Sequence, residues 1–142
     1  ADTIPNVGMV TIGDIGDVDD IHPKDKKTLG ERLALYARGM IYGEDVTYRP
    51  PVCREASFDG EKVTLKFSDA GEGLYETKKH KFLAVYDDGA EREVPYEICG
   101  DSVKLNCDGK APAEICFCFD NESPVFLYSS VGLPVSPFRI KL

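Results

Sequence analysis

The sequence lacks several features that would each assign a function class directly. No apolar run approaches the roughly 20 residues that a bilayer-spanning helix needs. Residues 1–6 lack the basic start and apolar centre of a signal peptide. The net charge is −8, from 25 acidic against 17 basic residues, so no basic face is available for phosphates. We therefore expect no nucleic-acid partner and no membrane partner.

Cysteine and serine are present, but not in settings that indicate a site. The five cysteines form no Cys-x-x-Cys pair, which argues against a zinc knuckle or a thioredoxin-like site. Buried thiols are the simplest interpretation, one or two disulfides are the alternative, and Cys116 and Cys118 are expected on one face of a strand. No serine has the Gly-x-Ser-x-Gly setting of an exposed nucleophile, so the serines are interpreted as turn and strand residues.

The chain divides in character near residue 43, which predicts two parts, 1–43 and 44–142. In the first part, residues 7–12 are expected to form a buried strand, and a loop rich in Gly and Asp follows. Residues 24–42 are expected to form one helix, with Pro23 near its first turn. Its predicted apolar stripe consists of Leu29, Leu33, Tyr36, Ala37 and Met40. One strand and one helix cannot bury both their faces, so this part requires a larger partner.

Residues 44–142 show short runs of β-forming residues separated by Asp-Gly-type turns about every ten residues. This pattern predicts an antiparallel β-sandwich, and the fold class as a whole is α+β. The predicted strands are 63–67, 82–86, 92–98, 103–107, 114–119 and 125–128. Six aromatic residues are assigned to the sandwich core, with a sugar-stacking platform as the alternative: Tyr75, Tyr86, Tyr96, Phe126, Tyr128 and Phe138.

His22 is the candidate catalytic residue. It lies in the loop before the predicted helix, and Asp19 precedes it at the Asp-x-x-His spacing. A carboxylate there can accept from Nδ1–H and leave Nε2 free to take a proton. Asp17 and Asp20 are alternatives to Asp19, and a surface histidine without a catalytic role is the alternative for His22. The second histidine, His80, stands among lysines and is expected to be solvated.

The acidic loop also offers a metal-site interpretation, which its spacing disfavours. Asp14, Asp17, Asp19 and Asp20 supply oxygen ligands suited to a hard cation. An EF-hand loop counted from Asp17 requires a glycine at its sixth position and a glutamate at its twelfth, and these are His22 and Thr28. We therefore predict no metal site.

Two segments of the chain resemble the sialate O-acetylesterases, which are SGNH-type (GDSL-like) carbohydrate esterases. The first resembles their late catalytic block and the second their closing segment, in the same order. The matching residues are Met9-Val10-Thr11-Ile12, Asp14-Ile15-Gly16-Asp17, Asp20-Ile21-His22-Pro23-Lys24-Asp25-Lys26 and Gly30-Glu31-Arg32-Leu33-Ala34-Leu35, then Asp120-Asn121, Leu127-Tyr128 and Gly132-Leu133-Pro134-Val135-Ser136-Pro137-Phe138-Arg139.

The resemblance implies that residues 1–43 end an SGNH α/β/α hydrolase domain and that residues 44–142 form an accessory β-sandwich. Such enzymes remove O-acetyl groups from sialic acid or related sugars through a serine near the start of the hydrolase domain. His22 falls where their catalytic base lies, Asp19 matches the acid, and a Ser-His dyad is the alternative. No cofactor is implied, and the location implied is periplasmic, secreted or lysosomal.

We therefore expect the chain to be the C-terminal portion of such an esterase. Its partners would be the absent N-terminal hydrolase portion, in the same polypeptide or a second chain, and an acetylated sugar substrate. The chain alone is expected to be inactive. The alternative is a non-catalytic carbohydrate-binding or structural sandwich module.

Overall fold

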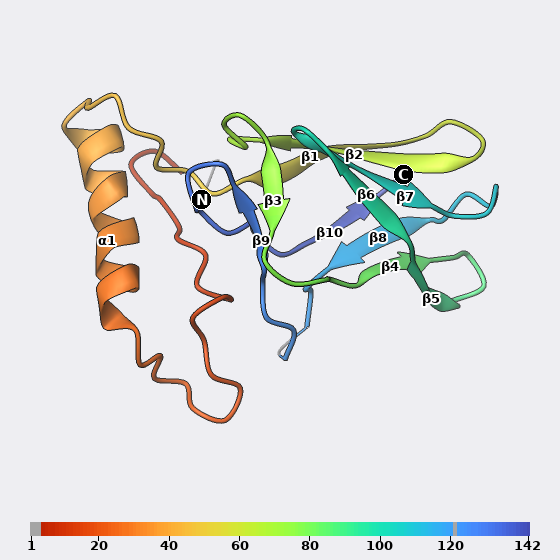
Figure 1. Ribbon diagram of the computed structural model, residues 1–142, viewed down its shortest axis with the longest axis horizontal. Helices are drawn as coiled ribbons and strands as arrows, with labels where there is room; N and C mark the ends of the chain where they lie inside the picture. Colours follow the sequence, from red (N-terminus) through yellow and green to blue (C-terminus); the bar gives the residue numbers. More distant parts are fainter. Residues whose placement is uncertain (1–3, 121) are drawn as a thin grey trace.

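The computed structural model describes residues 4–120 and 122–142, so the start of the chain at 1–3 and the Asn121 of the family match lie outside the described residues. The β-forming runs pair into two four-stranded antiparallel sheets and one two-stranded antiparallel sheet (Figure 1). In the first sheet the order is β1 (Val52–Phe58), β2 (Lys62–Ser68), β7 (Ser102–Asn106) and β6 (Tyr96–Cys99). In the second it is β10 (Phe138–Lys141), β8 (Glu114–Phe117), β4 (Phe82–Val85) and β5 (Glu91–Val94). The small sheet pairs β3 (Leu74–Glu76) with β9 (Leu127–Ser129).

The two large sheets share one core, as the alternation of the sequence requires. Along β2, Val63, Leu65 and Phe67 are buried and alternate with more exposed residues. Phe67 meets Phe138 of the other sheet with ring centroids 5.8 Å apart, and Phe138 stacks on Phe117 at 5.5 Å. The prediction of a largely antiparallel β fold with a sandwich-like core is therefore confirmed.

The predicted strand 92–98 is in fact two strands that belong to different sheets. Pro95 separates β5 from β6. Proline has no N–H to donate to a ladder, so it suits the point where the chain changes sheets. The carbonyl of Pro95 still accepts a hydrogen bond from the N–H of Asn106 at 2.8 Å.

The strand predicted at 7–12 is wrong, because no strand of the described residues pairs with it. A β-strand is held by hydrogen bonds to a neighbour, and a suitable composition alone does not form one. Of these residues only Thr11 is buried, and its hydroxyl lies 3.1 Å from that of Ser136. This contact joins the N-terminal segment to the C-terminal part of the sandwich.

The helix is shorter than predicted. α1 spans Lys26–Tyr36 and continues as a π-helical turn, η1, over Ala37–Ile41. Asp25 is the N-cap: its carboxylate accepts from the N–H of Thr28 at 3.0 Å and from its hydroxyl at 2.7 Å. Hydrogen bonds from Thr28 lower the pKa of Asp25. Pro23 therefore precedes the cap and does not lie in the first helical turn. No helix among the described residues is long and apolar enough to span a membrane.

The predicted apolar stripe of the helix is wrong at Leu33, whose exposed fraction is 53%. The buried residue of α1 is instead Arg32. The helix lies beside the sandwich, with the small β3–β9 sheet between them in the view of Figure 1. Arg32 is buried in place of Leu33 because it forms an ion pair with Asp14.

Substitution by alanine at two helical glycines, Gly30 and Gly39, is expected to change the free energy of unfolding in opposite directions. A Cβ at Gly30 meets nothing within 4 Å, whereas a Cβ at Gly39 lies 2.0 Å from the ring of Tyr48. We expect Gly30→Ala to raise the free energy of unfolding by about 0.5–1 kcal/mol, because alanine favours a helix. We expect Gly39→Ala to lower it by about 1–3 kcal/mol, because the ring must move. Urea denaturation of the two variants measures both, and equal effects would contradict the packing of Tyr48 on the helix.

Candidate functional site

A buried ion pair fixes the acidic loop to the helix. Arg32 Nη1 lies 2.7 Å from Asp14 Oδ1, and Nη2 lies 2.6 Å from Oδ2. Only 8% of the arginine side chain and 7% of the aspartate side chain are exposed. Arg32 Nη1 also donates to the carbonyl of Thr11 at 2.8 Å. The guanidinium therefore holds both the end of the N-terminal segment and the start of the loop.

Asp17 organises the next turn of the loop. One carboxylate oxygen accepts from the N–H of Asp19 at 3.1 Å, and the other lies 3.2 Å from Lys24 Nζ. The hydrogen bond from Asp19, followed by Lys24, lowers the pKa of Asp17. Asp14 and Asp17 thus bind cationic side chains and backbone groups. In the part of the chain that the structure describes, no three His, Cys, Asp or Glu side chains group as metal ligands.

His22 lies on the exposed surface of this loop, three residues before the helix cap. Its backbone N–H donates to Asp20 Oδ1 at 2.8 Å. Among residues 4–120 and 122–142, no hydrogen bond joins the His22 ring to Asp19 or to any other side chain. The structure therefore places the predicted base and acid in one short loop without bringing them together.

The three candidate acids differ in what their carboxylates bind. Asp17 is occupied by Asp19 and Lys24, and Asp20 accepts from the backbone of His22. The Asp19 side chain is exposed and has no hydrogen-bond partner among the described residues. Asp19 is consequently the carboxylate whose rotation toward a reoriented His22 ring breaks no existing contact. Its role as the acid stays a prediction.

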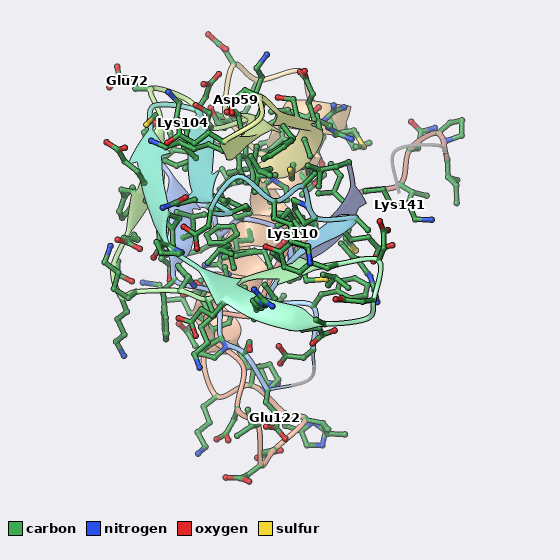
Figure 2. The ribbon with its side chains drawn as sticks, turned by 90° about the vertical axis from the view of Figure 1, so that its right-hand side faces the viewer. Asp59, Glu72, Lys104, Lys110, Glu122 and Lys141 are labelled. Atoms are coloured by element: carbon green, nitrogen blue, oxygen red, sulfur yellow. The ribbon has the colours of Figure 1, made fainter. Side chains whose placement is uncertain are left out.

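The first part of the chain exposes many large apolar side chains. Eight of the twelve exposed large hydrophobic side chains in the described residues lie in the first part of the chain. Ile21, beside His22, is 90% exposed, and Tyr42 is 74% exposed. The other six are Ile4, Val7, Met9, Val18, Leu33 and Ile41. Figure 2 shows charged side chains at both ends of the molecule, with Asp59, Glu72 and Lys104 at one end and Glu122 at the other. An exposed apolar surface of this kind is typical of an interface.

One groove of about 870 Å³ lies between the N-terminal segment and the first large sheet. Residues 4–9, Tyr36 and Met40 line one wall, and Val52 and Pro137 lie on the other. His22 does not line this groove. The groove is therefore formed in part by residues 4–9, and the predicted catalytic loop does not contribute His22 to it.

Gly100-Asp101-Ser102 has the Gly-Asp-Ser order of the nucleophile block in GDSL-type hydrolases, a signal that the interpretation of the serines from the sequence overlooks. Gly100 has a φ of 63° in the turn between β6 and β7. Ser102 is half-buried, and its hydroxyl donates to the carbonyl of Cys99 at 2.8 Å. Ser102 is thus a turn residue, in agreement with its interpretation from the sequence.

The cysteines are also unsuited to act as nucleophiles. All five thiols are free, so the disulfide alternative is wrong. Burial raises the pKa of Cys53 and of Cys118 to about 12, which keeps both thiols protonated at neutral pH. β8 ends at Phe117 and Cys118 has a φ of 45°, so Cys116 and Cys118 do not alternate within one strand as predicted.

The prediction of a solvated His80 is wrong. Its side chain is buried, and its ring contacts those of Phe117 and Phe126, with centroids 5.0 and 5.9 Å away. His80 Nε2 accepts from the N–H of Phe126 at 3.2 Å. The backbone N–H of His80 donates to the hydroxyl of Tyr96 at 2.9 Å, and that hydroxyl donates to the carboxylate of Glu76. His80 thus connects the segment just before β4 to the segment just before β9, and its role is structural.

The burial of His80 makes the fold sensitive to acid. Desolvation lowers the pKa of the folded ring below its ordinary value of 6.5, and a proton on Nε2 removes the acceptor for Phe126. The unfolded state then binds more protons, so the free energy of unfolding falls as the pH drops below about 6.5.

This pH dependence can be measured by urea denaturation between pH 7 and pH 5. His80→Gln keeps a side-chain acceptor and should flatten the profile, whereas His22→Gln at the exposed histidine should not. A wild-type profile that is already flat over this range would contradict the assignment.

Comparison with known proteins finds similarity among solved structures. No family model matches the chain, and no curated protein matches it. Among solved structures, the chain is similar to a carbohydrate acetylesterase from Xanthomonas citri, with 36% sequence identity and a TM-score of 0.82. The match covers 90% of this chain and 31% of that protein, so the chain spans about a third of the length of the enzyme it resembles. The similarity supports a relation to carbohydrate esterases.

Proposed function

We propose that this chain is the C-terminal part of a carbohydrate esterase that removes O-acetyl groups from sialic acid or related sugars. The observation that carries the proposal is the match, over 90% of this chain, to a carbohydrate acetylesterase about three times as long. In this proposal residues 1–43 complete an SGNH hydrolase domain and residues 44–142 are its accessory sandwich. The proposal of sialic acid or a related sugar as the substrate rests on the resemblance of the two segments to the sialate O-acetylesterases.

The missing hydrolase portion is the proposed partner of the first part of the chain. Residues 7–12 have no strand partner among the described residues, and large apolar side chains on either side of them are exposed. The exposure of these side chains is explained if an upstream domain covers them. Burial of apolar surface contributes about 25 cal/mol per Å², which favours this assembly.

His22 is the proposed general base. A serine hydroxyl from the upstream portion attacks the acetyl carbonyl while Nε2 takes its proton. Imidazolium then gives the proton to the sugar oxygen as the ester C–O bond breaks, so the sugar leaves as an alcohol and an acetyl-serine remains. Water attacks this ester and loses a proton to Nε2, and that proton passes to the serine oxygen as acetate leaves. Asp19 is the carboxylate proposed to hold Nδ1–H, and the scheme uses no metal or organic cofactor.

The proposal is tested by assaying p-nitrophenyl acetate hydrolysis with the 142-residue chain and with the same chain joined to its upstream hydrolase portion. We expect background hydrolysis from the chain alone, because the nucleophile is proposed to lie in the upstream portion, and enzymatic turnover from the joined protein. Equal hydrolysis by both proteins, or none by the joined protein, would refute the proposal.

A further inference from the structure

We propose that two stacked tyrosines on the small sheet, Tyr75 of β3 and Tyr128 of β9, form a contact surface for a sugar ring. This inference extends the proposed function, since it assigns a binding site for a further sugar unit of the glycan substrate. The two residues are directly paired across the strands. Their ring centroids are 5.6 Å apart and their planes differ by 23°. Each ring therefore lies against part of the other's face, and the stacked pair leaves an outer aromatic face and its edges for a ligand.

The pair faces outward, not into the core. Its neighbours along the two strands, Leu74, Leu127 and Ser129, are buried, which is the alternation of a sheet with one covered face. Tyr75 is 44% exposed. Other aromatics that the sequence offered for a platform serve the interior: Tyr86 and Phe138 are buried, and Tyr96 hydrogen-bonds Glu76.

The position of the pair is well defined. The hydroxyl of Tyr128 donates to the carbonyl of Val125 at 3.4 Å, which fixes the ring relative to the start of β9. Beside it, Ser130 Oγ accepts from the N–H of Glu72 at 2.9 Å, which ties together the two turns that flank the sheet.

A pyranose ring is the ligand that this surface fits best. The C–H groups on one face of a pyranose carry partial positive charge and pack on the negative face of an aromatic ring, while sugar hydroxyls bond to polar groups at the edge. Tyrosine supplies a rigid apolar surface with a polar tip at low entropic cost. The carbohydrate specificity of the similar acetylesterase makes a sugar the occupant chosen here over a protein surface.

The binding test is native gel electrophoresis of the chain in gels that contain a polysaccharide. One arm uses acetylated glucomannan and the other uses sialylated submaxillary mucin, which separates neutral from acidic sugars. We expect retardation in one arm, a loss of affinity of about tenfold in Tyr75→Ala, and retention of binding in Tyr75→Phe. Phe119→Ala, at an aromatic that is 61% exposed outside the small sheet, is the matched control. Retardation in neither arm, or equal loss in Phe119→Ala, overturns the inference.

Kinetics of the joined protein separates this inference from the proposed function. Tyr75→Ala should raise KM for the acetylated polymer about tenfold more than KM for p-nitrophenyl acetate, which is too small to span both sites. Equal losses on both substrates would identify the pair as a contact for the upstream portion and overturn the sugar assignment. Absence of any turnover by the wild-type joined protein would refute the esterase proposal, while the gel result would still decide the sugar site.

Discussion

His22→Ala in the joined protein is expected to lower kcat for acetyl-ester hydrolysis by about three to six orders of magnitude, as removal of the base from a serine hydrolase does. The loss arises because the serine hydroxyl then has no group to take its proton, and the departing sugar has no donor. KM should change much less, because the exposed imidazole is proposed to act in the transition state. Stopped-flow or steady-state assay with p-nitrophenyl acetate measures the effect.

The second histidine provides the control for this experiment. His80→Gln keeps a hydrogen-bond acceptor in the aromatic cluster, far from the acidic loop in sequence, and should retain near-normal turnover at pH 7.5. Activity that survives in His22→Ala would remove the catalytic assignment of that residue. The acid is tested in the same assay: Asp19→Asn should lower kcat, whereas Asp20→Asn, whose side-chain oxygen still accepts from the His22 N–H, should have little effect.

Arg32→Met is expected to lower the free energy of unfolding by about 3–5 kcal/mol, which is the cost of leaving a buried carboxylate without its partner. The methionine fills a similar volume but cannot bind Asp14, and the Thr11 carbonyl also loses its donor. The damage should be concentrated where the loop meets the helix. Urea denaturation gives the total loss, and amide hydrogen exchange of α1 shows whether this region opens first.

Two variants control for the loss of a positive charge in itself. Arg38→Met removes an ion pair with Glu44 in which both side chains are nearly half exposed, so the expected loss is below about 1 kcal/mol. Adding Asp14→Asn to Arg32→Met removes the buried charge and should recover part of the stability. An Arg32→Met variant no less stable than Arg38→Met would show that the buried pair does not hold the loop.

The sequence predicts the central strands well because their apolar residues alternate without interruption. β2 and β7 alternate between buried and exposed residues over their lengths, and the core side chains could be chosen from this pattern alone. β1 was missed because its pairing contains an irregularity between Cys53 and Glu55, which breaks the two-residue period. β10 was missed because only Phe138 of its four residues is buried.

The environment of the candidate site was less predictable because its contacts join distant residues. Arg32 is buried only because Asp14, 18 residues earlier, receives both guanidinium nitrogens. His80 stands among lysines, yet its ring accepts from the N–H of Phe126, 46 residues later. Neither partner can be identified from periodicity. The helix cap, in contrast, is a local feature, since Asp25 accepts from the N–H of Thr28, only three residues later.

The central claim is that the His22 imidazole takes a proton from a hydroxyl supplied by the upstream portion. The most direct test is the distance from His22 Nε2 to the nearest serine Oγ in a crystal structure of the joined protein. The account predicts a separation of about 2.6–3.2 Å, within hydrogen-bond reach, at the floor of an open cleft. A His22 ring that still faces bulk solvent in that structure, with the serine paired to a different base, would contradict it.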